Sequence, residues 1–370
     1  MKQLPDRLSY SAFIEQETSR ILFEGALPGD LTRILSTIEE EADWISQWGV
    51  LASSEERAAR LAQEEHRLTT ARQRYLRAGY YYRLAHYFLM RDCEERRSLV
   101  AGANRCCGAG IAFGEPRVEA VTIPYAGRFA NGYLHFPTGQ ARPPCVVCIP
   151  GLGHTKESMH SWCTEGARRG LAVFVGDGPG YGDARTLRGE RLGASAFDQY
   201  LEGVLEFLAR DKRLDGHHVG LLGDCFGGLL ALRAASRDRR FKACAALEAI
   251  LDDPAHTART GPIPPLVLYH LLESDLSLFV ESGQVLAEAG PQIRCPVYLI
   301  HAETDELVPL SVARAVLGLI RGPTQLDVVP GPNCYANHLR NHYNAVLDHL
   351  GRWVPSAFDW LAAELAVARA

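Results

Sequence analysis

The sequence contains no apolar run approaching the roughly 18 to 20 residues that a bilayer-spanning helix needs. Its first residues alternate between charged and apolar side chains, a pattern that does not fit a secretory signal peptide. Basic residues are not in excess, since 39 Lys and Arg stand against 44 Asp and Glu, for a formal net charge of −5. A phosphate backbone would therefore find little to bind. These absences predict a cytoplasmic protein that binds neither a membrane nor nucleic acid.

A second cysteine pair with metal-ligand spacing is also absent, although the chain has ten cysteines. Cys145 and Cys148 form a C-x-x-C pair, but they lie in PPCVVCIPG, an apolar run typical of a buried strand. Side chains three positions apart on a strand point to opposite faces. We therefore expect buried, reduced thiols and no metal site.

Nucleotide-binding motifs are missing as well. No P-loop lysine is present, and the glycines of GDGPGYGDAR at residues 176–185 do not have the G-x-G-x-x-G spacing. We therefore expect no cofactor. This glycine-rich loop is instead predicted to lie at the mouth of a site, with Asp177 and Tyr181 as substrate-binding residues.

Proline is absent between residues 29 and 115, and the patterning in that part of the chain is entirely helical. Apolar residues near helical spacing begin at Leu31, and Ser53 or Ser54 is predicted to cap a second helix with acidic residues in its first turn. The spacing is not a strict heptad, which favours several packed helices over a coiled coil. Residues 1–112 are therefore predicted to form a helical N-terminal cap domain, and its apolar surface leads us to expect a homodimer.

From about residue 117 the pattern changes to strands. RVEAVTIPY and NGYLHFP predict a hairpin or meander, and buried strands then alternate with helical segments. Such alternation predicts an α/β fold, with a mostly parallel central sheet and helices on both faces. Residues 113–370 are predicted to be this catalytic domain. The interval at about 252–292 is too long for a simple crossover and predicts a lid-like insertion over the carboxyl ends of the strands.

The strongest local motif is G-x-C-x-G at residues 223–227, within VGLLGDCFGGLLALRAA. An apolar strand precedes it and an Ala/Leu-rich helix follows, which is the context of a nucleophile elbow. Cys225 would be the nucleophile, and the amide of Phe226 would help hold a developing oxyanion. The helix N-terminus should favour the thiolate. The alternative is a buried structural cysteine in a glycine-rich turn.

The chain order expected after the nucleophile is an acid and then a histidine. Asp305 follows the strand CPVYLIHAE and leads into a helix, with Glu303 and Glu306 as its rivals. His338 follows a turn rich in Gly, Pro and Asn, and His342, one helical turn later, is its chief rival. We expect Asp305 to orient His338, which in turn activates Cys225.

The loop after the first buried parallel strand, IPGLGHTKES, should supply the second oxyanion donor. A backbone N–H near Leu152 or Gly153 fits this role. His154 in the same loop and Tyr269 in the insertion are predicted to contact substrate.

With these residues in place, the chain resembles the FrsA-like (DUF1100) branch of the α/β-hydrolases, which includes 2,6-dihydroxypseudooxynicotine hydrolases and polyketide-shortening hydrolases. The resemblance extends over nearly the whole chain: ARQRYLRAGYYYRLAHYF at residues 71–88, Asp177 to Gly182, the elbow, and the positions of Asp305 and His338. It implies hydrolysis of a C–C or ester bond next to a carbonyl, with the helical domain capping the site.

The sequence departs from that family at the elbow, where the family normally has serine and this chain has Cys225. A thiolate is the better nucleophile at neutral pH and gives a thioester intermediate. Three hypotheses follow: a hydrolase of an acyl substrate such as a polyketide-like metabolite, an acyltransferase or condensing enzyme that passes the acyl group to an amine, alcohol or carbon nucleophile, and a non-catalytic binding protein.

Overall fold

The computed structural model describes residues 18, 21–38, 40–87, 89, 93–151, 153–249, 251, 287–305, 308–330 and 343–369. Four predicted site residues, Leu152, Tyr269, His338 and its rival His342, lie outside these ranges. The predicted insertion lies outside them too, except for residues 287–292, which include the short 3-10 helix η1 (Gly290–Gln292).

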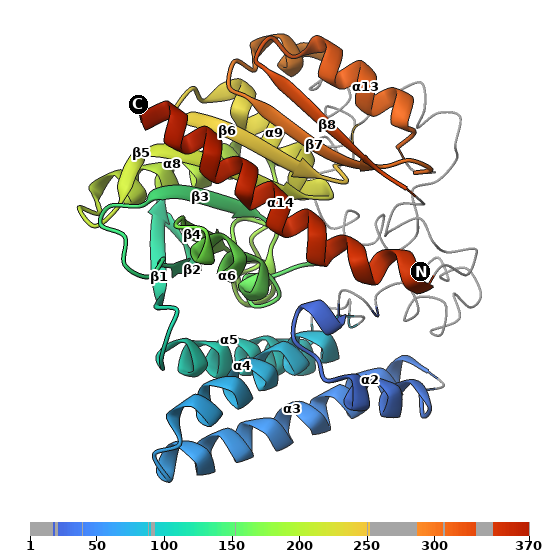
Figure 1. Ribbon diagram of the computed structural model, residues 1–370. Coiled ribbons are helices and arrows are strands. Elements are labelled where there is room, and N and C mark those ends of the chain that lie inside the picture. Colours follow the sequence, from blue (N-terminus) through green and yellow to red (C-terminus); the bar gives the residue numbers. More distant parts are fainter. Residues whose placement is uncertain are drawn as a thin grey trace.

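Helices form the first part of the described chain and lie together at one end of the molecule (Figure 1). They are α2 (Pro28–Leu35), α3 (Glu41–Glu64), α4 (Leu68–Ala85) and α5 (Glu94–Ile111). Aromatic residues hold them: Trp44 and Trp48 of α3 are fully buried, and the Trp44 indole donates a hydrogen bond of 2.6 Å to the carbonyl oxygen of Leu84. The helices therefore have an aromatic core of their own.

The predicted helix start at Ser53 or Ser54 was wrong. Helix α3 runs without interruption through both serines, because neither proline nor a close series of glycines breaks it there. The helix begins instead after Glu40, which forms a capping box with Asp43. The Ser53 hydroxyl lies 3.2 Å from the Tyr82 hydroxyl on α4, so it links two helices rather than capping one.

An eight-stranded sheet organises the rest of the described chain (Figure 1). Its strands are β1 (Val118–Tyr125), β2 (Arg128–His135), β3 (Pro144–Ile149), β4 (Ala172–Gly176), β5 (Asp215–Asp224), β6 (Phe241–Leu247), β7 (Val297–Ala302) and β8 (Thr324–Val329). The strand order is β1-β2-β4-β3-β5-β6-β7-β8. Strands β1 and β2 form the predicted hairpin, β2 pairs antiparallel with β4, and all later pairs are parallel.

Helices cover both faces of this sheet, as the buried strands predicted. They are α6 (His160–Arg168), α7 (Gly182–Arg188), α8 (Ala194–Arg210), α9 (Phe226–Arg237), α13 (Leu310–Leu319) and α14 (Tyr343–Arg369). Apolar side chains of α8, α9 and α13 pack in one core, and those of α6 and α14 pack in another. Cys145 belongs to the first core and Cys148 to the second, so the C-x-x-C pair does point to opposite faces, and both thiols are free.

Two general features bear on function. Among the described residues, no helix is long and apolar enough to cross a membrane, and no group of three or more His, Cys, Asp or Glu side chains could hold a metal ion in the same ranges. The parallel strands β3, β5, β6 and β7 end at one edge of the sheet, where ligand sites of open α/β sheets form. The predicted nucleophile and acid both follow strands that end at this edge.

Candidate active site

Cys225 lies at the sharp turn between β5 and α9 in a strained backbone conformation, with φ of 54° and ψ of −117°. A side chain other than glycine rarely adopts such a positive φ, and strain of this kind concentrates at functional sites. Hydrogen bonds fix the turn: the amide of Cys225 donates to the Leu247 carbonyl at 2.8 Å, and the amide of Gly228 donates to the Cys225 carbonyl at 3.0 Å. The side chain is almost completely buried.

The two glycines that flank Cys225 are required by close backbone approach. A Cβ atom on Gly223 would lie 2.2 Å from the carbonyl oxygen of Gly227. One on Gly227 would lie 2.1 Å from the carbonyl oxygen of Ile149 on β3. No side chain fits either space, so the G-x-C-x-G pattern is a packing requirement of this turn.

Two segments at the elbow supply backbone groups suited to an oxyanion. Phe226 is the first residue of α9, so its amide lies at the positive end of the helix dipole. The loop after β3 approaches from the other side: a Cβ atom on Gly151 would lie 3.2 Å from Cβ of Cys225. Gly153 in this loop has a φ of 77°. The structure thus brings Phe226 and the predicted oxyanion loop to Cys225.

Asp305 follows β7 and is the buried acid of that loop, whereas Glu303 is exposed. One Asp305 carboxylate oxygen accepts a hydrogen bond of 3.0 Å from the amide of Val308, and the other lies 3.6 Å from Nε2 of His301. A buried and anchored carboxylate suits the role of orienting a histidine better than a solvated one. Glu306 lies outside the described residues.

A chain of buried charged and polar side chains connects the helices to the elbow; we call it the elbow chain and define it as Arg83, Glu24, His154 and Asp224. Arg83 of α4 donates a hydrogen bond of 2.9 Å to the carbonyl of Gly153 and lies 3.7 Å from the Glu24 carboxylate. His154 lies 3.8 Å from Glu24 through Nε2 and 3.3 Å from Asp224 through Nδ1. Asp224 directly precedes Cys225.

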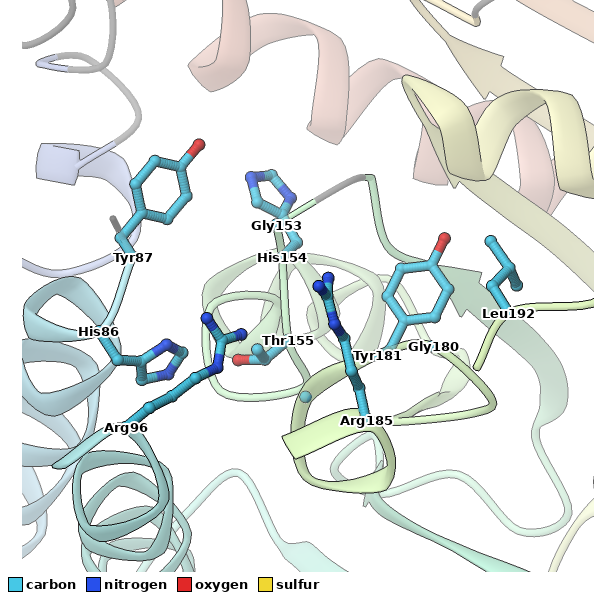
Figure 2. A pocket seen from close by; sticks show the side chains of 11 residues that line it. His86, Tyr87, Arg96, Gly153, His154, Thr155, Gly180, Tyr181, Arg185 and Leu192 are labelled. Carbon is cyan, nitrogen blue, oxygen red and sulfur yellow. The ribbon is translucent and has the colours of Figure 1, made fainter. Parts of the chain in front are cut away.

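A pocket opens between the helices and the sheet loops beside this chain (Figure 2). Its accessible volume is about 30 Å³. Its lining comes from the helical region, the loop after β3 and the loop after β4: His86, Tyr87, Arg96, Gly153, His154, Thr155, Gly180, Tyr181, Gly182, Arg185 and Leu192. The predicted substrate-binding residues His154 and Tyr181 are therefore pocket residues.

Asp177 does not line this pocket, so its predicted contact with substrate is not supported. It belongs to a group of buried charges, the loop cluster, formed by Lys156, Glu157, Asp177 and Asp183. Asn104 of α5 accepts a hydrogen bond of 2.7 Å from Lys156, and Arg188 lies 3.0 Å from Asp183. The ammonium group of Lys156 lies 2.6 Å from Asp177 and 2.7 Å from Glu157. The amides of Lys156 and Asp183 also donate to Asp177, at 2.9 and 3.1 Å. Asp177 therefore fixes the loop that carries Tyr181.

In the loop cluster, the positive charge of Lys156 and the negative charges of the carboxylates around it stabilise one another. Burial lowers the pKa of Lys156, but the carboxylates of Asp177, Glu157 and Asp183 outweigh that effect and raise the pKa above its usual value. Burial raises the pKa of Asp177 to about 6 despite the lowering effect of Lys156. A lysine with three acidic neighbours has its charge fully engaged, which indicates a structural role.

Sequence reasoning missed several residues of this region. Lys156 lies only two positions after His154, in the predicted oxyanion loop, so its place in the sequence was a usable signal. Arg185 of α7 lies four positions after Tyr181, the residue that precedes the helix, so this spacing would bring the two side chains to the same side. Glu24 and Arg83 gave no such signal, because their contacts join segments far apart in the sequence.

A family model described as "Esterase FrsA-like" matches residues 35–282. The match includes the helices from the end of α2 and extends through the elbow. Among curated proteins, 2,6-dihydropseudooxynicotine hydrolase of Paenarthrobacter nicotinovorans is 29% identical over 192 residues, which are 51% of this chain and 51% of that protein. The 20-hydroxy-prefusarin hydrolase FUS2 of Gibberella moniliformis is 29% identical over 262 residues, 65% of this chain and 62% of that protein. The chain thus spans about half of the first relative and less than two thirds of the second.

Solved structures share the fold over most of the chain. The crystal structure of 2,6-dihydroxy-pseudo-oxynicotine hydrolase superposes with a TM-score of 0.79 at 23% identity and covers 95% of this chain and 96% of its own. The structure of wild-type AbyA5 gives a TM-score of 0.67 at 19% identity, covering 95% and 99%. The family model matches more than half of the sequence, so the chain belongs to the FrsA-like family of α/β-hydrolases.

Proposed function

We propose that the protein is a hydrolase that forms an acyl-enzyme on Cys225 and cleaves a C–C, ester or thioester bond next to a carbonyl group. The observation that carries this proposal is the strained turn at Cys225, held between two glycines whose positions admit no side chain. Such strain persists only where the surrounding structure maintains it, and here it holds Cβ of Cys225 next to Gly151 in the loop after β3. A purely structural cysteine would not need this conformation.

The proposed chemistry begins with transfer of the Cys225 thiol proton to His338, which Asp305 orients. The sulfur attacks the substrate carbonyl, a C–S bond forms, and the oxyanion is held by the amides of Phe226 and of Leu152 or Gly153. Collapse breaks the bond to the leaving group, which takes the proton from His338. Water then attacks the thioester, His338 accepts a proton from it, and the C–S bond breaks to return the Cys225 thiol.

An oxygen-rich acyl substrate, such as a polyketide-like metabolite, suits the pocket. Its lining includes the guanidinium groups of Arg96 and Arg185 and the phenol groups of Tyr87 and Tyr181 (Figure 2). Such groups donate hydrogen bonds to carbonyl and hydroxyl oxygens. Two relatives whose names state hydrolysis of 2,6-dihydropseudooxynicotine and of 20-hydroxy-prefusarin support this substrate class.

Acyl transfer is the second candidate function, and Cys225 itself is the observation that favours it. A thioester reacts readily with amines and other soft nucleophiles, so a bound acceptor could take the acyl group in place of water. The two functions share every step up to the acyl-enzyme and differ only in the group that attacks it.

Steady-state turnover distinguishes them. Acyl N-acetylcysteamine thioesters and p-nitrophenyl esters would be incubated with wild type and with Cys225→Ala, with and without an added amine, and products quantified by chromatography. The proposal expects free acid from the wild type at a rate that the amine does not change, and loss of turnover in Cys225→Ala. Product formed only with the amine would establish acyl transfer. Equal turnover by both proteins would exclude Cys225 as the nucleophile.

A further inference from the structure

The hydroxyl group of Tyr181 is a buried hydrogen-bond donor at the pocket. Tyr181 is 4% exposed, and its hydroxyl has no hydrogen-bond partner among the residues that the structure describes. Native proteins pair the large majority of their buried polar groups, and a particular exception calls for an explanation such as a ligand. Tyr181 is one of several such exceptions among the described residues, and it lines the pocket while its phenol lies close enough to Cys225 to interact with it electrostatically.

The position of this hydroxyl is fixed by the protein before any ligand arrives. The Tyr181 amide donates to Gly178 at 3.0 Å, and the Tyr181 carbonyl accepts from the amide of Arg185 at 3.0 Å. Its ring packs against Phe197 at a centroid distance of 6.5 Å. In Figure 2 the side chains of Tyr181 and Arg185 rise next to each other from the same turn. A donor held in this way binds an acceptor with little loss of conformational freedom.

The sheet order indicates which part of a substrate would meet Tyr181. Its loop follows β4, Cys225 follows β5, and β3 lies between these two strands. Neighbouring strands are about 4.8 Å apart, so the two loops start about 10 Å apart. The oxygen of the attacked carbonyl is assigned to the amides at the elbow and in the loop after β3. The Tyr181 phenol extends from its loop toward Cys225, close enough for the two groups to interact electrostatically. Its hydroxyl would therefore reach a neighbouring oxygen of the same substrate, separate from that of the attacked carbonyl.

The protonation state agrees with a donor role. Burial raises the pKa of the Tyr181 phenol, and the neighbouring Cys225 and Asp224 raise it further. Tyr181 therefore keeps its proton at neutral pH even while a thiolate forms nearby. It donates a hydrogen bond and does not act as a base.

We propose that Tyr181 is a specificity-determining residue whose hydroxyl donates a hydrogen bond to a second substrate oxygen, on the carbon β to the attacked carbonyl. The inference rests on the proposed function and names its substrate class, 3-oxo or 3-hydroxy acyl compounds. Substrates without this oxygen leave the Tyr181 hydroxyl buried and unpaired, which costs transition-state binding.

The test uses two N-acetylcysteamine thioesters, 3-oxobutanoyl and butanoyl, which differ only in the β-oxygen. Wild type should prefer the 3-oxo thioester in kcat/KM. Tyr181→Phe should lower kcat/KM for that thioester by about 10- to 100-fold and leave the butanoyl value within about threefold, the scale of one buried hydrogen bond. Its Tm should not fall, because the Tyr181 hydroxyl has no hydrogen-bond partner among the described residues.

Tyr81→Phe is the matched control, since the Tyr81 hydroxyl is buried in the helical region and bonds Asp30 at 2.7 Å and the Leu27 amide at 3.1 Å. It should lower Tm and keep the substrate preference. Equal losses on both thioesters in Tyr181→Phe, or no loss on either, would overturn the inference.

A binding measurement separates this inference from the proposed function. Cys225→Ala, with and without Tyr181→Phe, would be titrated with both thioesters by calorimetry, a readout that needs no turnover. Weaker binding of the 3-oxo thioester alone upon Tyr181→Phe supports the inference, even where wild type turns over neither thioester and the nucleophile proposal fails. Unchanged binding and unchanged preference in Tyr181→Phe overturn the inference while leaving the Cys225 proposal in place.

Discussion

Glu56 and Glu24 are two buried carboxylates of the helical region. Their chemistry is similar, but their hydrogen-bond and ion-pair partners lie in different parts of the molecule. Glu56 binds Arg105 at 3.0 and 3.1 Å, Arg60 at 2.5 Å and Tyr82 at 2.9 Å, all on the helices. Glu24 lies near Arg83 on the helices and near His154 in the loop after β3. The first group is closed within the helices, whereas the second extends to the residue that precedes Cys225. We conclude that Glu56 holds the helices together and that Glu24 ties them to the elbow.

The loop cluster around Lys156 is a second group of buried charges. Of the proposed substitutions, removing its lysine should have the largest effect on stability. Lys156→Met would leave Asp177 and Glu157 buried without their cation, while Asp183 keeps Arg188 at 3.0 Å, at an expected loss of about 3 to 5 kcal/mol in unfolding free energy. Urea denaturation followed by circular dichroism measures this loss. Lys212→Met, at an exposed lysine, should change stability by less than about 0.5 kcal/mol. Equal stability of the two variants would show that the cluster is not a structural clamp.

Acid should weaken the closed group at Glu56. Burial alone would raise the pKa of Glu56, but hydrogen bonds from Arg105, Tyr82 and Arg60 outweigh it and lower the pKa from 4.5 to about 2. Because the folded-state pKa lies below the unfolded value, this contribution is fully present above pH 4.5 and is lost as pH falls toward 2. Its size is on the order of 2 kcal/mol.

Denaturation curves of wild type and Glu56→Gln between pH 7 and pH 3 would measure that loss. The wild-type advantage should shrink as pH falls within this range, because the glutamine side chain of the variant does not titrate. A constant difference between the two proteins would contradict the role assigned to Glu56.

The elbow chain is predicted to affect catalysis more than stability. Glu24→Gln should weaken the contacts that orient His154 and, through it, Asp224, and should lower kcat on an acyl thioester by about 10-fold with a smaller change in KM. Glu56→Gln is the matched control, with a comparable loss of Tm and an unchanged kcat. The same kcat in both variants would remove the distinction between the two carboxylates.

The sequence predicted those parts of the site that depend on local pattern. The G-x-C-x-G turn, the buried strands on either side of it and the position of Asp305 each follow from short stretches of residues, and the structure contains them. The cap at Ser53 was wrong because a continuing helix with a partner at Tyr82 outweighed a local capping preference. Asp177 was assigned to the substrate because its charge was visible in the sequence, whereas its buried partner Lys156 was not recognised.

Contacts between residues far apart in the chain could not be predicted from the sequence, for a physical reason. The elbow chain joins Glu24, Arg83, His154 and Asp224, which are separated by dozens of residues and are brought together only by packing of the helices on the sheet loops. No periodicity or spacing encodes such contacts. The roles of His338 and Tyr269 stay predictions, since both residues lie outside the described ranges.

Intact-protein mass spectrometry after reaction with an acyl thioester tests the central claim most directly. Wild type, Cys225→Ala and Cys163→Ala, a control at another buried cysteine, would be quenched in acid at short times and the adduct located by peptide mapping. Nucleophilic catalysis by Cys225 predicts one acyl group on wild type and on Cys163→Ala, placed on Cys225, and none on Cys225→Ala. An adduct that persists in Cys225→Ala, or none on any protein alongside normal turnover, would contradict it.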